Sequence, residues 1–392
     1  MNICFFTSEY VSPLRGGVER VTFILYNEFK NRGHNCYIIA RDRPISEDIL
    51  WDGQNLLLNN DVVDSEENVD FVSDFICKNN IQFIVNQSHH TDMFKLGLMM
   101  KERYNCKLIT VYHTHPLAIH KGIKDLFAEI VWREINSVKR TIRICDWVVR
   151  YCYRSYSRKR YIKTMLQQRY RGSDAFVLLS NGYRSVFNRI VSVGDKKLFV
   201  VENPMEQKDV IVKEKKKKIL WIGRMTFDAK RPDRIIKIWE NIFTKCLDWE
   251  LYMLGDGDVR GLLEQYCEQK NIKNIHFVGN VDPTVYYSEA SILCMTSSYE
   301  GLPMVLVEAL QNRVIPIVYN SIEAFGDIIK DKRTGFVIDS FKKGQYEKKL
   351  LELISNKKER CEIVKNIEDD DIFDSLSLDV IYNKWMNLFN QI

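Results

Sequence analysis

Short apolar runs alternate with amphipathic segments along most of the 392-residue chain. Apolar runs of about four to eight residues between polar or glycine residues are typical of buried strands, and apolar residues every third or fourth position are typical of helices. Strands are expected at 2–7, 36–40, 83–85, 107–112, 174–180, 199–204, 219–223, 249–255, 275–279, 290–295 and 315–318. Helices are expected at 18–32, 69–78, 93–104, 233–243, 261–270, 285–289, 345–355 and 376–389. This alternation predicts an α/β fold with parallel sheets.

The pattern restarts after a polar, lysine-rich stretch at 208–218, which places a domain boundary near 204–217. The chain is 45% hydrophobic and 28% charged, and it is long enough for two domains of ordinary size. Its ten cysteines form no CxxC pair, which favours reduced, mostly buried thiols and a cytosolic setting. The first residues lack the basic start of a signal peptide, and no run reaches the roughly 18 apolar residues of a membrane span. Any membrane contact is therefore expected to be peripheral.

Residues 121–171 differ from the rest because they hold fourteen Lys or Arg against four acidic residues, interleaved with Trp and Tyr. The segment lacks proline and has one glycine, Gly122, so it is expected to be largely helical. Basic helices with aromatic residues suit an anionic membrane surface, and they also suit nucleic acid or a solvated face. The membrane is favoured and nucleic acid is not expected. The residues assigned to membrane or acceptor binding are Arg150, Arg154, Arg158, Lys159, Arg160 and Lys163.

Polar side chains follow several predicted strands. Gly16 and Gly17 follow the first strand, and glycine lets a backbone approach a ligand closely. Four of the seven histidines lie beyond two later strand ends; they are His89, His90, His113 and His115. In open α/β sheets ligands bind beyond the carboxyl ends of strands. Sugar contacts are favoured over zinc because no further ligands stand at motif spacing.

In the second half, Arg224 follows the strand at 219–223, and Lys230 stands six positions later before a helix. Two cations in a strand-to-helix loop can clamp a phosphate, although a surface basic loop is the alternative. The Asp256-Gly257-Asp258 run resembles a metal-binding DxD, but capping of the next helix is favoured.

Residues 290–310 predict a strand, a glycine turn and a helix, with Pro303 in the first helical turn. Such a turn directs backbone N–H groups and the positive helix end toward an anion. Glu300 and Glu308 flank it. Acids beside an anion-binding helix end suit hydroxyl groups, and a sugar nucleotide carries both hydroxyls and phosphates. An ordinary turn with surface acids is the alternative.

Taken together, these motifs resemble the family-4 glycosyltransferases of the GT-B fold. The resemblance rests on Gly16-Gly17, the strand ending at His113, the Arg224 and Lys230 pair, and the E-x7-E spacing of Glu300 and Glu308. It implies two Rossmann-like domains facing a central cleft, with a C-terminal helix crossing back to the first. The implied division is 1–205, including the basic insert 121–171, plus 376–392 for the first domain, and 206–375 for the second.

The resemblance also implies roles for single residues. Arg224 and Lys230 would neutralise the diphosphate, Glu308 would bind the ribose, and Glu300 would hold the donor sugar. His113 would lie near the reacting carbon. Catalytic roles thus go to His113, Glu300, Arg224 and Lys230, with no metal. The implied donor-binding residues are Gly16, Gly17, Arg224, Lys230, Val278, Glu300, Gly301, Leu302, Pro303, Met304, Val307 and Glu308.

The expected protein is a retaining, metal-independent hexosyltransferase at the inner face of the cytoplasmic membrane. It would move a hexose or N-acetylhexosamine from a nucleotide-sugar to a glycan or polyprenyl-linked acceptor in surface-polysaccharide synthesis. UDP-sugar is favoured over GDP-sugar as co-substrate, and no cofactor is expected. The alternatives are a transferase with a soluble acceptor and a non-catalytic nucleotide-sugar-binding protein.

Overall fold

The computed structural model describes residues 1–12, 17–43, 55–118, 127, 129–133, 137–192, 194–205, 214–339 and 344–392. They form two compact units. The first unit consists of Met1–His113, Lys163–Gln207 and Asp374–Ile392, and the second consists of Thr114–Ile162 and Lys208–Phe373. The sequence places a domain change at residue 205, close to the change after Gln207. It assigns the whole basic insert to the first domain, whereas in the structure residues 114–162 group with the second unit.

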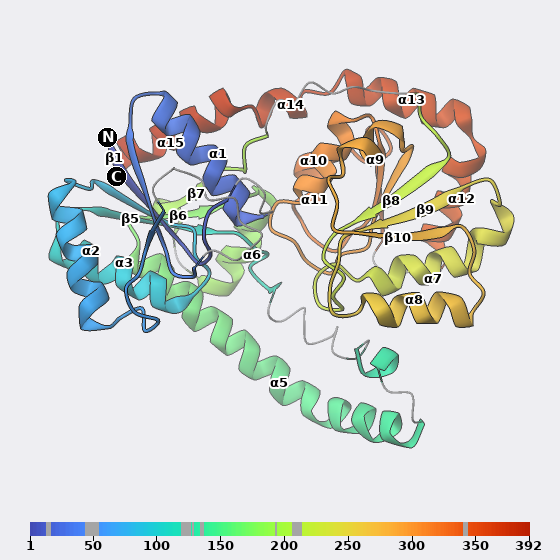
Figure 1. The fold of residues 1–392 in the computed structure, drawn as a ribbon, viewed down its shortest axis with the longest axis horizontal. Helices are drawn as coiled ribbons and strands as arrows, with labels where there is room; N and C mark the ends of the chain where they lie inside the picture. Colours follow the sequence, from blue (N-terminus) through green and yellow to red (C-terminus); the bar gives the residue numbers. More distant parts are fainter. Residues whose placement is uncertain are drawn as a thin grey trace. The chain divides into compact units, whose positions relative to one another are not determined.

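The first unit is built on a seven-stranded parallel sheet (Figure 1). Its strand order is β3-β2-β1-β4-β5-β6-β7, so the direction of strand addition reverses between β1 and β4. The strands are β1 Asn2–Thr7, β2 Asn35–Ala40, β3 Asn55–Leu57, β4 Phe83–Asn86, β5 Lys107–Tyr112, β6 Ala175–Leu178 and β7 Leu198–Val200. Its principal helices are α1 Val18–Asn31, α2 Glu66–Lys78, α3 Thr91–Arg103 and α6 Gly182–Val191.

Helices cover both faces of this sheet. Since successive side chains of a strand point to opposite faces, neighbouring residues of β1 pack against different helices. Cys4 and Phe6 of β1 join a buried cluster with apolar residues of α2 and α3. Phe5, between them, instead contacts Phe29 of α1, with ring centroids 6.3 Å apart. Both faces of β1 are therefore buried, which explains why its sequence is a continuous apolar run.

The C-terminal helix α15, Leu378–Gln391, packs on the first unit. The Phe389 ring lies 4.5 Å from Phe83 and 5.8 Å from Phe29, measured between centroids. His34 Nε2 also lies 2.9 Å from Tyr382 Oη. The expected return of the last helix to the first domain is confirmed.

The second unit is built on a six-stranded parallel sheet with the order β10-β9-β8-β11-β12-β13 (Figure 1). The strands are β8 Lys218–Ile222, β9 Glu250–Leu254, β10 Ile275–Gly279, β11 Ile292–Met295, β12 Ile315–Tyr319 and β13 Phe336–Ile338. The helices are α7 Pro232–Ile242, α8 Arg260–Gln269, α9 Thr284–Glu289, α10 Met304–Gln311, α11 Phe325–Ile328, α12 Gln345–Ser355 and α13 Lys357–Glu368, and α14 Ile372–Ser375 follows. Strand order reverses between β8 and β11.

The basic insert is helical where the structure describes it. Its main element is α5, Ser137–Gly172, a single helix of 36 residues. Near its end a buried face anchors it in the first unit, where the Tyr170 ring lies 5.8 Å from that of Phe187 in α6. Ahead of α5, Trp132 packs on the second unit, 4.7 Å from the Tyr266 ring of α8.

All ten cysteines are free thiols, and six of them are buried, as the sequence predicts for most. Burial raises the pKa of the Cys36 thiol to about 12. Within the part of the chain that the structure describes, no helix is both long and apolar enough to cross a membrane.

The aromatic contacts of α15 predict the cost of losing one ring. Replacing Phe389→Ala should lower the free energy of unfolding of the first unit by about 3–5 kcal/mol, because the removed ring leaves a cavity between α15 and the sheet. Chemical denaturation followed by tryptophan fluorescence measures this. Asn387→Ala, an exposed position on the same helix, is the control and should change stability by less than about 0.5 kcal/mol. Equal effects of the two substitutions would contradict the assigned packing.

Candidate functional site

The strand orders locate a candidate site in each unit. In open parallel sheets, the loops on either side of the order reversal diverge and leave room for a ligand beyond the carboxyl ends of the strands. In the second unit the reversal separates β8 from β11. The loop after β8 carries Arg224 and Lys230, and the turn after β11 carries Glu300. The structure therefore brings three of the four predicted catalytic residues to one edge of one sheet.

Glycines hold the strand ends of this sheet close together. Gly255 has φ +121°, and a Cβ there would lie far inside van der Waals contact with the carbonyl oxygen of Gly223. Gly255 N–H donates to Gly279 O at 2.7 Å, and Gly223 N–H donates to Leu254 O at 3.0 Å. The backbones after β8, β9 and β10 are therefore packed directly against one another. Only glycine fits at position 255 without moving them.

Lys230 and Glu300 link the loops across the reversal. Lys230 Nζ lies 2.9 Å from Glu300 Oε1, and both side chains are mostly buried. A Cβ on Gly223 would come within 2.9 Å of Lys230 Cδ, so the lysine stem lies over this glycine. Arg224 begins the same loop, and its side chain is exposed. The site thus combines Lys230, which is paired with Glu300, and the exposed Arg224.

The turn after β11 agrees with the predicted strand, turn and helix, with two corrections. Pro303 occupies the N-cap position before α10 rather than the first helical turn. The Met304 N–H donates to Leu302 O at 2.9 Å, so this N–H is engaged within the turn and is not directed toward an anion as expected. Glu308 lies in α10, where its Oε2 accepts a 3.1 Å hydrogen bond from Tyr287 Oη.

The remaining predicted donor residues of the second unit lie around this turn or further along the edge. Leu302 is buried in the turn, whereas Gly301 is half-buried. Val307 is fully buried in α10, so its side chain packs beneath the turn. Val278 lies half-buried in β10, at the opposite edge of the sheet from β13.

The predicted capping role of Asp256 and Asp258 is wrong. The N-cap of α8 is Val259, and no side chain of a described residue caps this helix. Asp256 instead accepts from the N–H of Gly257 at 2.7 Å and pairs with Arg260 at 3.0 Å. These two contacts hold the pKa of the Asp256 carboxyl below its usual range. Among the described residues, no cluster of three or more His, Cys, Asp or Glu is placed to bind a metal ion.

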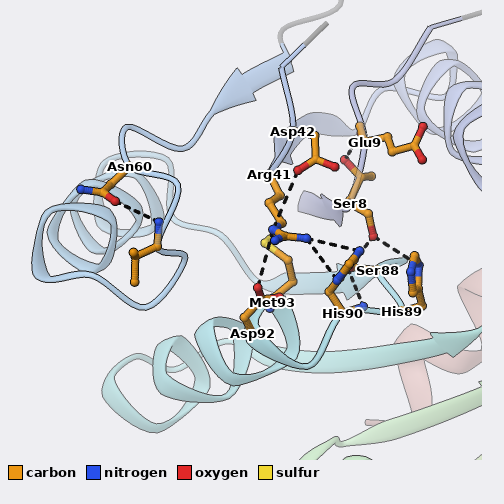
Figure 2. Close-up of polar contacts among 12 residues, drawn as sticks. Ser8, Glu9, Arg41, Asp42, Asn60, Ser88, His89, His90, Asp92 and Met93 are labelled. Carbon is orange, nitrogen blue, oxygen red and sulfur yellow. Dashed lines mark hydrogen bonds and ion pairs between the residues drawn. The ribbon is translucent and has the colours of Figure 1, made fainter. Parts of the chain in front are cut away.

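The first unit has a second polar cluster at its own order reversal, between β1 and β4. Ser8 Oγ and Ser88 Oγ lie 2.7 Å apart and join the two strand ends. His89 also contacts Ser8 (Figure 2), and its Nδ1 lies 3.5 Å from Ser8 Oγ. At the end of β5, His113 Nε2 donates to Gln87 Oε1. The cluster therefore presents hydroxyl, amide and imidazole groups.

His113 is neutral in this environment. Burial, with a smaller contribution from the neighbouring His89, lowers its pKa to about 3. Burial also lowers the pKa of His89, with His90 and Arg169 adding to the shift. A neutral imidazole both donates and accepts hydrogen bonds, so His113 suits a sugar hydroxyl better than an anion.

Two arginines complete this cluster, and the sequence reasoning did not identify them. Arg169 of α5 is 2% exposed, and its Nη2 donates to His89 O at 2.5 Å. Arg41, after β2, lies 3.1 Å from His90 Nδ1 and 3.6 Å from an oxygen of Asp92 (Figure 2). The local sequence gives no signal for either arginine, because Arg41 meets His90 across 49 positions of chain and Arg169 meets His89 across 80.

The other predicted residues of the first unit are placed only in part. Gly17 has φ +71° and stands directly before α1. Gly16 lies outside the described residues. His115, two positions after His113, belongs to the second unit, where its Nε2 lies 2.8 Å from Glu323 Oε2. The four histidines of the sequence analysis therefore do not form one group.

Two separate parallel sheets, each with helices on both faces, define the class of fold as GT-B, the two-domain α/β fold of many glycosyltransferases. Solved structures agree over the full chain. TarM of S. aureus matches with a TM-score of 0.73 and 14% identity, covering 100% of this chain and 99% of that one. Anabaena HepE in complex with UDP matches with a TM-score of 0.72 and 11% identity, covering 100% of both chains.

Within this fold, residues 203–370 match the model of the family described as glycosyl transferases group 1. The amylovoran biosynthesis glycosyltransferase AmsD of Erwinia amylovora is 28% identical over 200 residues, 50% of this chain and 55% of that protein. The Campylobacter jejuni enzyme named GalNAc-alpha-(1->4)-GalNAc-alpha-(1->3)-diNAcBac-PP-undecaprenol alpha-1,4-N-acetyl-D-galactosaminyltransferase is 27% identical over 225 residues, 56% of this chain and 60% of that protein. The chain spans about half the length of the curated relatives it matches.

The lowered pKa of His113 predicts a pH dependence of stability. Folded His113 binds no proton above about pH 3, whereas an unfolded histidine binds one below about pH 6.5. Protonation therefore favours the unfolded state, and His113 makes the first unit less stable as pH falls from about 6.5 toward 3, by up to about 1.4 kcal/mol per pH unit. His113→Gln should flatten this part of the profile.

Urea denaturation at a series of pH values measures the effect. His276→Gln, at an exposed histidine in β10 of the second unit, is the matched control and should leave the first unit's profile unchanged. A profile of His113→Gln that parallels the unsubstituted protein from pH 7 to pH 4 would show that His113 is not held neutral.

Proposed function

We propose that this protein is a retaining glycosyltransferase that uses a nucleotide-sugar without a metal ion. The observation that carries the proposal is the Lys230–Glu300 pair at the β8–β11 reversal, beside Arg224. This is the part of the chain that matches the glycosyl transferase model. Cations and a carboxylate at one strand edge suit a ligand with a diphosphate next to sugar hydroxyls.

The leaving group is the first task of such a site. The departing nucleoside diphosphate gains negative charge as the glycosidic bond to it breaks, and fixed cations stabilise that charge. Arg224 offers a planar guanidinium that can bind two phosphate oxygens. The Lys230 ammonium has three N–H donors, so Glu300 can engage one while the others face the diphosphate. Together they supply the charge that a bound metal would provide in a metal-dependent transferase.

The two carboxylates bind hydroxyls in this proposal. Glu308 lies in α10 with one oxygen engaged by Tyr287 Oη, which orients the carboxylate for a ribose hydroxyl. Glu300 holds hydroxyls of the donor sugar, while Leu302 and the backbone of the turn line the same wall. In the first unit, neutral His113 serves a sugar hydroxyl. We assign front-face transfer with retention, in which the leaving phosphate takes the acceptor proton.

The relatives support the donor and acceptor classes of this proposal. HepE and TarM were solved in complexes that contain UDP, which supports a UDP-sugar carrying a hexose or N-acetylhexosamine. The Campylobacter jejuni relative is named for an undecaprenol-linked glycan acceptor, and an Escherichia coli relative for lipopolysaccharide galactosyl transfer. A lipid-linked or lipid-anchored glycan in surface-polysaccharide synthesis is therefore the proposed acceptor.

Removing either cation tests the site directly. Arg224→Ala and Lys230→Ala should each weaken UDP binding about tenfold to a hundredfold, since a charge-assisted hydrogen bond contributes about 1.5–3 kcal/mol. Isothermal titration with UDP, in the presence of a chelator, gives the affinity and tests metal independence at once. Lys245→Ala, an exposed lysine in the same unit, is the control and should bind UDP normally.

A screen of UDP-, GDP- and ADP-sugars by thermal shift complements the titration, because a bound donor stabilises the folded state by mass action. UDP binding that survives both substitutions, or that appears only with added Mg²⁺, would reject the assigned phosphate site.

A further inference from the structure

The first two thirds of α5 carry exposed apolar side chains that no described element covers. From residue 137 to residue 161 the helix contains no buried residue. Ile142 is 63% exposed, Val149 79%, Tyr153 76% and Tyr156 65%. Figure 1 shows α5 as one continuous helix. Large apolar side chains exposed at this density, on one element, mark an interaction surface.

These side chains lie on one face of the helix. Residues three, four or seven positions apart share a helical face. Ile142, Val149, Tyr153 and Tyr156 follow this spacing, and two exposed cysteines, Cys145 and Cys152, fall on the same face. This set, with Val138, is called the apolar stripe.

Arginines form a second face beside the apolar stripe. Arg143, Arg150 and Arg154 each follow a stripe residue by one position, and Arg158 continues the series. One residue corresponds to a rotation of roughly 100° around the helix. Residues 137–161 carry eight Lys or Arg and one acidic residue, Asp146, which pairs with Arg150 at 2.5 Å. The exposed part of α5 is therefore amphipathic, with one apolar and one strongly basic face.

We propose that this face of α5 docks on an anionic lipid bilayer, with the apolar stripe in the headgroup region and the arginines on lipid phosphates. An amphipathic helix with aromatic and aliphatic residues beside Lys and Arg lies in the interface plane of such a membrane. Tyrosine suits this depth because its ring is apolar and its hydroxyl is polar. The bilayer accounts for both faces of the helix at once.

A second copy of the chain is the alternative occupant, because the stripe spacing also fits a two-helix seam. Pairing two such helices would place the basic residues of one copy, among them Arg154, Arg158 and Lys159, beside those of the other. Like charges at that density oppose association. An anionic membrane surface instead attracts each nearby Lys or Arg side chain. Charge therefore selects the bilayer.

Co-sedimentation with vesicles tests the docking, using the whole protein without donor or acceptor, so the result is independent of the UDP titration. The protein should pellet with phosphatidylglycerol-containing vesicles, remain in solution with pure phosphatidylcholine, and be released by high salt. Arg154→Glu with Arg158→Glu should weaken binding by at least an order of magnitude. The matched control is Lys357→Glu with Lys358→Glu, an equal charge change at exposed lysines of α13, and it should retain most of the binding.

The apolar stripe is tested separately. Val149→Gln with Tyr153→Gln should also reduce binding to anionic vesicles, while Leu247→Gln, at an exposed leucine of the second unit, should not. A polarity-sensitive fluorophore on Cys152 should shift to shorter wavelength on these vesicles. The same fluorophore on exposed Cys361 of α13 should not shift. Single-cysteine reactivity is obtained by replacing the other exposed cysteines with serine.

Three outcomes would overturn the proposal. The first is equal pelleting with neutral and anionic vesicles, or no effect of the α5 substitutions. The second is a dimer, detected by light scattering, that Val149→Gln with Tyr153→Gln abolishes, combined with no binding of the protein to vesicles. The third is salt-sensitive RNA binding through α5 in a gel shift without binding to vesicles.

Discussion

The organisation of the second unit depends on one steric constraint, the direct backbone contact between Gly255 and Gly223. Because no side chain fits between them, the ends of β8 and β9 are fixed at close distance. The same Gly223 leaves room above its Cα, and the Lys230 stem occupies that room. Lys230 then reaches Glu300 across the reversal of strand order. Glycine at position 223 thus determines where Lys230, seven residues later, places its ammonium group.

Much of the fold could be predicted from the sequence because buried parallel strands are continuous apolar runs. The pattern missed β3, Asn55–Leu57, which is three half-buried residues at a sheet edge and too short to show a period. It also missed α6, although Tyr183, Val186, Phe187 and Val191 stand at helical spacing and are buried. The longer α13 was missed because only Ile363 and Ile367 are buried in a largely charged helix.

The candidate site in the second unit could be predicted from the sequence because its residues stand in short segments that follow strands. Arg224 and Lys230 share one loop, and Glu300 and Glu308 share one turn and helix. The cluster in the first unit was not accessible in the same way. Ser8 meets Ser88, and Arg169 meets His89, each across 80 positions of chain. Only the strand order reveals such pairs, and periodicity carries no information on it.

The return of α15 to the first unit has a consequence for how the protein is made. That unit is assembled from three separate stretches of chain, and the last of them ends with the helix Leu378–Gln391. During synthesis, the faces of Phe29 and Phe83 that meet Phe389 stay uncovered until the ribosome has completed the whole of the second unit. Contacts between such distant residues form slowly, and exposed apolar surface favours aggregation meanwhile. The nascent first unit therefore keeps these apolar faces exposed until α15 has been synthesised.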